Sequence, residues 1–465
     1  MPPKRRRNNP PDPEPTRAAS SPGRDQSVSA NEEEDDDDNN PSLPLPFYNT
    51  TFSAHRVSPL YLGSEPLTAT RLQVLAQRLR DRLVGDVVRG VEVGIGAPDG
   101  EDSIIGRAGA LEKVEIRWVG VAEVMGLSRD ELGSLTEVEG TATTDWRSAA
   151  AQLPDKKALH ISLQYEMASC TALMLPPLIP GRDAGTDAAK TRFAVGGNTD
   201  DMDWEHSIDP AHFLALPLLL LRMPTPLKTV VGEFLSTTFD CRVSAMRLGT
   251  RSLVRSWEAW IRSAGLPSRG PLAKDVVLSL GFHIPPSGGA PSQPSGEEDA
   301  AAADHQQPLG LKTIDVIVPA TELRKFVAAG KRLARAQSQQ TSSTPNWGWE
   351  NDLKQRRKLA GRLGEEGWEW HGASQDEGGF PQPFTEALAC YLKEHMGLNM
   401  FHPGVRVVKI ACGGFAMSEM RLKVFTPAGS TDAEGEGVPL LGQKGAVLEL
   451  LAGLVEKAQA QMVAV

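Results

Sequence analysis

The chain has 465 residues, of which 40% are hydrophobic, 49 are Lys or Arg and 59 are Asp or Glu, so its formal net charge is −10. This length exceeds what one hydrophobic core usually supports, and the hydrophobic fraction is sufficient for a packed core. The acidic balance argues against a general nucleic-acid binder, although acidic and basic residues are unevenly distributed.

Residues 1–44 are rich in Pro, Ser, Asn and acidic residues, and they include the unbroken acidic run Glu32–Asp38. Such a segment buries too little apolar surface to offset the entropy of ordering, so we expect a disordered tail. Within it, Lys4, Arg5, Arg6 and Arg7 fit a nuclear-import signal, and the alternative is a solvated charge patch.

Folding is expected to begin near residue 45, where four aromatic residues (Phe47, Tyr48, Phe52 and Tyr61) appear together. Apolar residues at helical spacing predict a helix over Thr68–Val84. Four strands are then predicted, at Val87–Ile95, Val114–Val119, Leu159–Met167 and Thr171–Leu175. Because no helical crossover separates them, we predict an α+β protein with mainly antiparallel sheets flanked by helices.

The longest apolar stretch, Phe213–Leu221, contains Pro217 and is about half of the ~20 residues that a membrane span needs, so no membrane segment is predicted. The four cysteines follow no disulfide or metal-ligand spacing, which is typical of a reducing compartment. No signal-peptide pattern follows Met1, and we therefore expect a soluble, intracellular protein.

A helix from Pro226 to about Thr238 and a strand over Phe239–Leu248 come next. The helix expected over Thr250–Ala264 has an apolar face with Trp257 and Trp260. We expect the opposite, solvent-facing side to carry Arg251, Arg255, Glu258 and Arg262.

The C-terminal half is predicted to contain a hairpin of Asp275–Ile284 and Thr313–Val318, followed by a helix after Pro319. A helix over Phe384–Met396, strands Val405–Cys412 and Met420–Phe425, and a helix over about Gly445–Ala458 complete it. Flexible inserts are expected near residues 285–310 and 337–380. We expect an N-terminal α+β domain at residues 45–224 and a C-terminal α+β domain at residues 225–465.

Two basic stretches predict a surface for contact with DNA phosphates. Residues 241–274 hold seven basic residues against one acidic residue, and residues 324–362 hold ten against two. Phosphate contact needs only positioned positive charge. The candidate residues are Arg247, Arg251, Arg255, Arg262, Lys331 and Arg332, and the alternative is an ordinary solvated helix face.

The strand pair near the C-terminus is either core or an interface. Its apolar residues can pack internally, or they can meet another chain's sheet. The candidate partner-binding residues are Val405, Val407, Val408, Ile410, Leu422, Val424 and Phe425. Trp347, Trp349, Trp368 and Trp370, in otherwise polar sequence, form a second candidate interaction motif.

The sequence contains no motif of high catalytic specificity, no metal-spaced Cys/His cluster and no phosphate-binding loop, so no cofactor or metal is predicted. Two rival interpretations stay open. One is a homodimeric DNA-associated protein. The other is an enzyme whose site is assembled from scattered residues such as Asp240, His283 and Glu322.

Three segments resemble the CENP-L family of inner-kinetochore proteins, fungal type. They are the aromatic strand with the turn residues His55, Arg56, Ser58, Pro59 and Leu60; the segment Phe239–Ser244 leading to Trp257 and Trp260; and Val405–Phe415. Together they cover about residues 45–427.

The resemblance implies a non-enzymatic scaffold of the constitutive inner kinetochore (CCAN), located in the nucleus at the centromere and acting in chromosome segregation. It implies a heterodimer with a CENP-N-like subunit through Val405–Phe425, and contacts with other inner-kinetochore subunits. It also implies that the Arg247–Arg262 region helps to line a basic channel for centromeric DNA, and that the nucleosome is bound through the complex.

Overall fold

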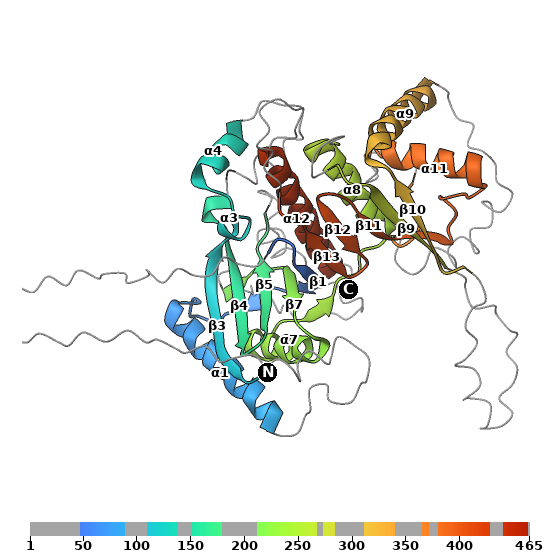
Figure 1. Cartoon of the computed structure of the whole chain (residues 1–465). Coiled ribbons are helices and arrows are strands. Elements are labelled where there is room, and N and C mark those ends of the chain that lie inside the picture. The colour runs from blue at the N-terminus through green and yellow to red at the C-terminus, as the bar shows by residue number, and fades with distance from the viewer. Residues whose placement is uncertain are drawn as a thin grey trace, which may run out of the picture. The chain divides into compact units, whose positions relative to one another are not determined.

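The computed structural model describes residues 47–88, 109–137, 151, 153–178, 212–266, 273–283, 311–339, 365–371, 380–427 and 440–463. The predicted N-terminal tail, its basic run Lys4–Arg7 and the insert at 285–310 lie outside these residues. The described part is an α+β fold built on one antiparallel sheet with helices on its faces (Figure 1). This confirms the predicted fold class.

The strand order of the sheet is β10-β9-β11-β12-β13-β1-β7-β5-β4-β3, and β8 also pairs with β1. All pairings are antiparallel. The strands are β1 (Thr51–Val57), β3 (Leu111–Gly120), β4 (Lys157–Tyr165), β5 (Ser169–Leu175), β7 (Leu218–Arg222), β8 (Val243–Ala245), β9 (Val276–Phe282), β10 (Thr313–Val318), β11 (Val405–Ala411), β12 (Phe415–Ser418) and β13 (Arg421–Val424). The short strands β2 (Leu60–Tyr61) and β6 (Phe213–Leu214) form a separate pair.

The apolar stretch that ends at Leu221 is a central strand of the sheet. Leu218 to Leu221 are all buried in β7, alternately in the two core clusters on opposite faces of the sheet. A strand that is covered on both faces has a continuous apolar sequence rather than an alternation of apolar and polar residues. In the described part of the chain, no helix has the length and apolarity needed to cross a membrane.

Two helices cover one face of the N-terminal half of the sheet. Helix α1 (Ala69–Val88) packs with Leu72, Leu75 and Leu79, and helix α7 (Thr225–Phe239) packs with Val231 and Phe234, against β4, β5 and β7. The resulting cluster also contains Val57 and Leu60 of the N-terminal aromatic segment.

The larger core lies on the opposite face and extends along the C-terminal strands. Its helices are α3 (Val121–Val124), α4 (Arg129–Glu137), α8 (Thr250–Ala264), α9 (Ala320–Gln339), α11 (Pro383–Met396) and α12 (Leu440–Val463). Helix α12 packs on α8, and α11 packs on α9 (Figure 1). Phe47 and Phe52 are buried in this core, as expected for the residues at which folding begins.

Three predicted elements differ from the structure. The segment Phe239–Leu248 forms a strand only at Val243–Ala245, because Phe239 ends α7 and Asp240 adopts a left-handed conformation. Val87 and Val88 belong to α1, and the rest of the strand predicted over Val87–Ile95 lies outside the described residues. The last helix begins at Leu440 rather than near Gly445.

The sheet crosses the expected domain boundary between residues 224 and 225. Strand β1 pairs with β7 on one side and with β13 on the other, so it joins strands from both expected domains. Residues 45–465 cluster as one compact unit. Whether the two halves fold independently stays a prediction.

Candidate functional site

Five of the seven predicted partner-binding residues are buried in the chain's own core. Val405, Val407, Ile410, Leu422 and Val424 are each at most 4% exposed. Strand β11 lies between β9 and β12, and β13 lies between β12 and β1. Neither strand therefore has an unpaired edge to which another chain can add a strand.

Val408 and Phe425 are the two residues of this set that are half-buried. A register irregularity between Val407 and Lys409 displaces Val408, whose Cγ1 would lie 2.8 Å from a Cβ built on Gly281 of β9. The ring of Phe425 lies between two lysines, with Lys274 Nζ at 5.6 Å and Lys423 Nζ at 5.4 Å from its centroid. These two side chains are the part of the predicted set that a partner can reach.

The two end strands of the sheet differ in how well their edges are protected. Strand β3 carries Glu115, whose carboxylate pairs with Lys113 at 3.1 Å and Arg117 at 3.7 Å, and its register is irregular near Leu111. Charged side chains and bulges are common devices that prevent edge-to-edge pairing.

Strand β10 has less of this protection, because its register with β9 is regular and it carries one charged residue. It pairs only with β9 among the described residues, and its sequence is Thr-Ile-Asp-Val-Ile-Val. Its one charged residue, Asp315, accepts a hydrogen bond from Ser279 Oγ at 2.6 Å, while Ile317 is 61% exposed. An apolar edge strand of this kind favours pairing with another chain.

Three of the predicted phosphate-contacting arginines line one groove. Arg251, Arg255 and Arg262 of α8 face Lys457 and the small residues of α12 across a groove of about 450 Å³. Helix α8 positions them together because residues four and seven positions apart, about one and two helical turns, share one helix face.

The groove also contains carboxylates, so its positive charge is partly neutralised. Arg255 pairs with Glu456 at 3.8 Å, Lys457 pairs with Glu365, and Ser263 Oγ donates a hydrogen bond to Glu449. Burial, together with the charges of Arg251 and Arg255, lowers the pKa of Lys457 to about 8. Arg251, Arg255 and Lys457 therefore lie close enough for their positive charges to repel one another.

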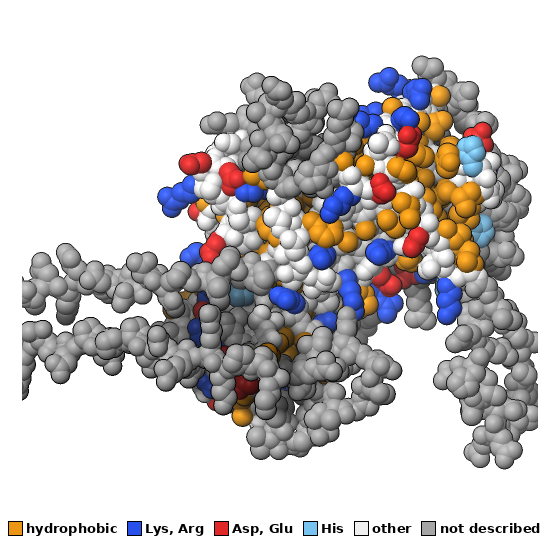
Figure 2. Space-filling view, in the orientation of Figure 1, with side chains coloured by type: hydrophobic (Ala, Val, Ile, Leu, Met, Phe, Trp, Pro, Cys, Tyr) orange, Lys and Arg blue, Asp and Glu red, His pale blue; other side chains and the backbone are white. Residues whose placement is uncertain are grey.

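The other predicted basic residues lie elsewhere. Arg247 lines a neighbouring smaller pocket and pairs with Glu419 at 3.9 Å. Lys331 and Arg332 are exposed on α9, where Figure 2 shows basic side chains near the tip of the helix. The structure therefore brings together three of the six candidates for phosphate contact.

The prediction that Glu258 lies on the solvent-facing side of α8 is wrong. Glu258 was expected on the solvent side with the arginines, but it is 1% exposed and accepts hydrogen bonds from the backbone N and Oγ1 of Thr385. Burial raises its pKa to about 7 although these hydrogen bonds favour the ionised form. The sequence signal was limited to spacing, which could not reveal that α11 packs there.

Two of the four tryptophans predicted as an interaction motif belong to the core. Trp368 and Trp370 are buried, and Trp368 Nε1 donates a hydrogen bond to the backbone oxygen of Val405 at 3.0 Å. The expectation of a flexible insert is therefore wrong for residues 365–371. Trp347 and Trp349 lie outside the described residues.

The residues of the alternative enzyme hypothesis lie on three different elements. Asp240 follows α7, His283 follows β9 and donates its backbone N–H to Gly404, and Glu322 pairs with Lys325 on α9. Among the described residues, no group of three His, Cys, Asp or Glu is arranged to hold a metal ion.

Comparison with known proteins identifies the family. A family model described as CENP-L, Centromere protein L, matches residues 46–459, which include both halves of the sheet. No curated protein matches the chain. Because the family match covers far more than half of the sequence, the chain belongs to the CENP-L family and is a centromere protein of the kinetochore.

Proposed function

We propose that the chain is a structural subunit of the constitutive inner kinetochore that pairs with a CENP-N-like subunit and thereby supports the binding of centromeric chromatin. Its role is binding and geometry, not catalysis. Other inner-kinetochore subunits are further partners, and the nucleosome is bound through the complex. In this proposal Lys4–Arg7 direct the chain to the nucleus.

The observation that supports pairing is the outer edge of β10, which has no strand partner in the described part of the chain. The proposed pairing places the interface in the C-terminal part of the sheet, and β10 is the end strand of that part. A strand of the partner that pairs with β10 would extend the sheet and cover Ile317. Val408 of β11 and Phe425, which follows β13 and lies beside Lys274, would then be further side-chain contacts with the partner.

Pairing is tested by co-expression of the chain with a CENP-N-like protein, followed by measurement of the mass of the purified complex. We expect a one-to-one complex that is lost when Ile317→Lys and Thr313→Lys place two ammonium groups on the β10 edge. Glu112→Lys on β3 is the matched control and should leave the complex intact. A stable homodimer in place of the heterodimer would contradict this pairing and favour the alternative of a homodimeric DNA-associated protein.

We further propose that Arg251, Arg255 and Arg262 contact DNA phosphates within the assembled complex. Their convergence on one groove supports this assignment, and the carboxylates in the groove limit the expected gain in affinity. Arg262→Gln should weaken the binding of a DNA duplex by the complex and reduce the slope of log affinity against log salt by roughly one. Arg129→Gln on α4 should change neither, and equal effects of both substitutions would contradict the assignment.

A further inference from the structure

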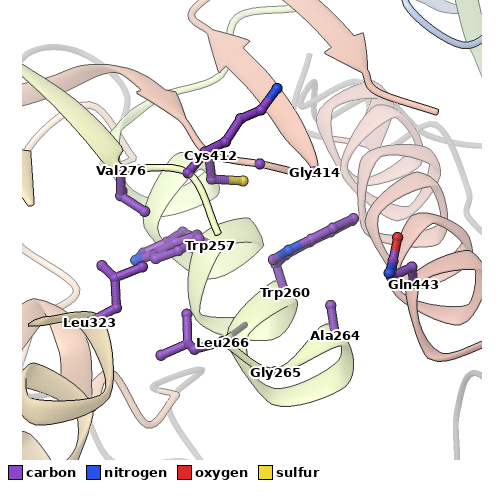
Figure 3. Close-up of a pocket in the computed structure, with 12 residues that line it drawn as sticks. Trp257, Trp260, Ala264, Gly265, Leu266, Val276, Leu323, Cys412, Gly414 and Gln443 are labelled. Atoms are coloured by element: carbon purple, nitrogen blue, oxygen red, sulfur yellow. The ribbon is translucent and has the colours of Figure 1, made fainter. Parts of the chain in front are cut away.

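A small pocket opens between α8, α9, α12 and the hairpin that joins β11 to β12. Its walls include Trp257, Trp260, Val276, Cys412, Gly414 and Gln443 (Figure 3). At Gly414 the backbone lies so close to Trp260 that a Cβ would come within 1.9 Å of the ring carbon Cζ2. At Gly414 the hairpin therefore forms the pocket wall with its backbone alone.

Two hydrogen-bond donors in the pocket wall have no acceptor among the described residues. They are Nε1 of Trp257, which is 1% exposed, and Nε2 of Gln443, which is also buried. Figure 3 shows the Trp257 nitrogen directed toward Val276 and Leu323, which also line the pocket. A buried donor without an acceptor is costly, so the pocket favours a group that supplies a carbonyl or carboxylate oxygen.

The rim of the pocket is positively charged. Lys274 lines the pocket and lies over the Phe425 ring, and Lys423 lies over the same ring. The backbone N–H of Phe425 donates to Gly414 at 2.9 Å, which connects this cationic and aromatic cluster to the pocket wall. Lys274 therefore belongs to the pocket wall, and Lys423 joins it through the shared Phe425 ring.

The volume of the pocket limits the size of its occupant. It is about 30 Å³, which is room for about two water molecules or for the end of one small apolar side chain. A tryptophan or leucine side chain does not fit without rearrangement. The adjoining charges favour acidic residues on either side of the group that enters.

We propose that this pocket is a docking site for an acidic segment of a partner protein. A small apolar side chain of the segment enters the pocket, a carbonyl oxygen of the segment accepts the Trp257 N–H on the side of Val276 and Leu323, and flanking carboxylates pair with Lys274 and Lys423. This site shares Phe425 with the proposed partner surface, but it does not use the outer edge of β10, so it does not rest on strand pairing there.

The test uses the full chain and a fluorescein-labelled nonapeptide with four acidic residues on each side of a central alanine. Fluorescence anisotropy should detect binding, and a peptide with central tryptophan should bind about tenfold more weakly. The double variant Lys274→Glu, Lys423→Glu should raise Kd about tenfold or more. Trp257→Phe, which keeps an aromatic ring but removes the donor, should raise Kd about fivefold with an unchanged far-UV circular dichroism spectrum.

Arg129→Glu is the matched control for charge reversal and should bind the alanine-centred peptide as the unmodified chain does. The proposal is overturned if the peptide fails to bind at about 100 μM, or if the double variant binds it equally well. It is also overturned if the double variant binds a DNA duplex more weakly but binds the peptide as before, because the two lysines would then bind nucleic acid.

Discussion

Glu258 Oε1 of α8 accepts two hydrogen bonds from Thr385 of α11, one from the backbone N at 2.9 Å and one from Oγ1 at 2.8 Å. Thr385 lies in the first turn of α11, where backbone N–H groups have no partner within the helix. The residue that precedes α11, Gln382, makes no side-chain cap. Glu258 thus caps a neighbouring helix and fixes α11 on α8.

The raised pKa of Glu258 makes stability depend on pH. In the unfolded chain this carboxyl ionises near pH 4.5, whereas in the folded chain its pKa is about 7. Between these values the unfolded state has released a proton that the folded state keeps, so stability falls as pH rises from 4.5 to 7 and then levels off. The loss is about 3 kcal/mol. Urea unfolding of Glu258→Gln should lack this decline, while the exposed control Glu112→Gln should retain it.

His160 is expected to make stability depend on pH in the opposite direction. It is buried in β4, neither ring nitrogen has a hydrogen-bond partner among the described residues, and burial lowers its pKa to about 4. Its contribution to stability is complete above pH 6.5 and is lost as pH falls toward 4, by about 3 kcal/mol. His160→Leu should therefore gain stability relative to the unmodified chain at pH 5 and less at pH 8. An equal gain at both values would contradict a neutral buried imidazole.

Gly414 and Gly453 offer a matched pair of substitutions. A Cβ at Gly414 overlaps the Trp260 ring, which is itself held against Phe415 with ring centroids 5.2 Å apart. Gly414→Ala should destabilise the protein by about 1–3 kcal/mol because it overpacks this site. At Gly453 in α12 a Cβ meets nothing within 4 Å, so Gly453→Ala should stabilise by up to about 1 kcal/mol through helix propensity. Equal midpoints of chemical unfolding for the two variants would contradict the close contact between Gly414 and the Trp260 ring.

Trp368 tests whether the segment at residues 365–371 is part of the core. Trp368→Phe removes the hydrogen bond to the Val405 carbonyl and should cost about 1–3 kcal/mol. Limited proteolysis should then cut near this segment faster than in the unmodified chain. Trp370→Phe is the control, because its N–H bonds only to Gly367 in the same segment. Unchanged proteolysis in Trp368→Phe would mean that the hydrogen bond does not hold the segment.

Elements with strong local signals were predicted accurately from the sequence. Helix α8 has the bounds expected from its apolar spacing and from Gly265, and β10 has the bounds expected from its alternating apolar residues. In both cases the determinants lie within the element or beside it. The antiparallel fold class followed for the same reason, because successive strands without crossovers leave few alternatives.

Features set by distant neighbours were not predicted. Glu258 occupies a position that spacing assigns to solvent, and only the docking of α11 buries it. The apolar alternation of β11 and β13 is the same for an edge strand and an interior strand, so sequence alone could not show that β12 closes the gap between them. Trp368 and Trp370 stand in polar sequence, and their burial depends on Val405 and on Phe401 and Phe380.

The unprotected strand β10 also affects the chain when it is alone. Exposed strand edges promote self-association as protein concentration rises, and orphan subunits with such edges are substrates for chaperones and proteases. The cellular abundance of this polypeptide should thus follow the supply of whichever molecule shields Thr313–Val318, whatever the rate of its own synthesis.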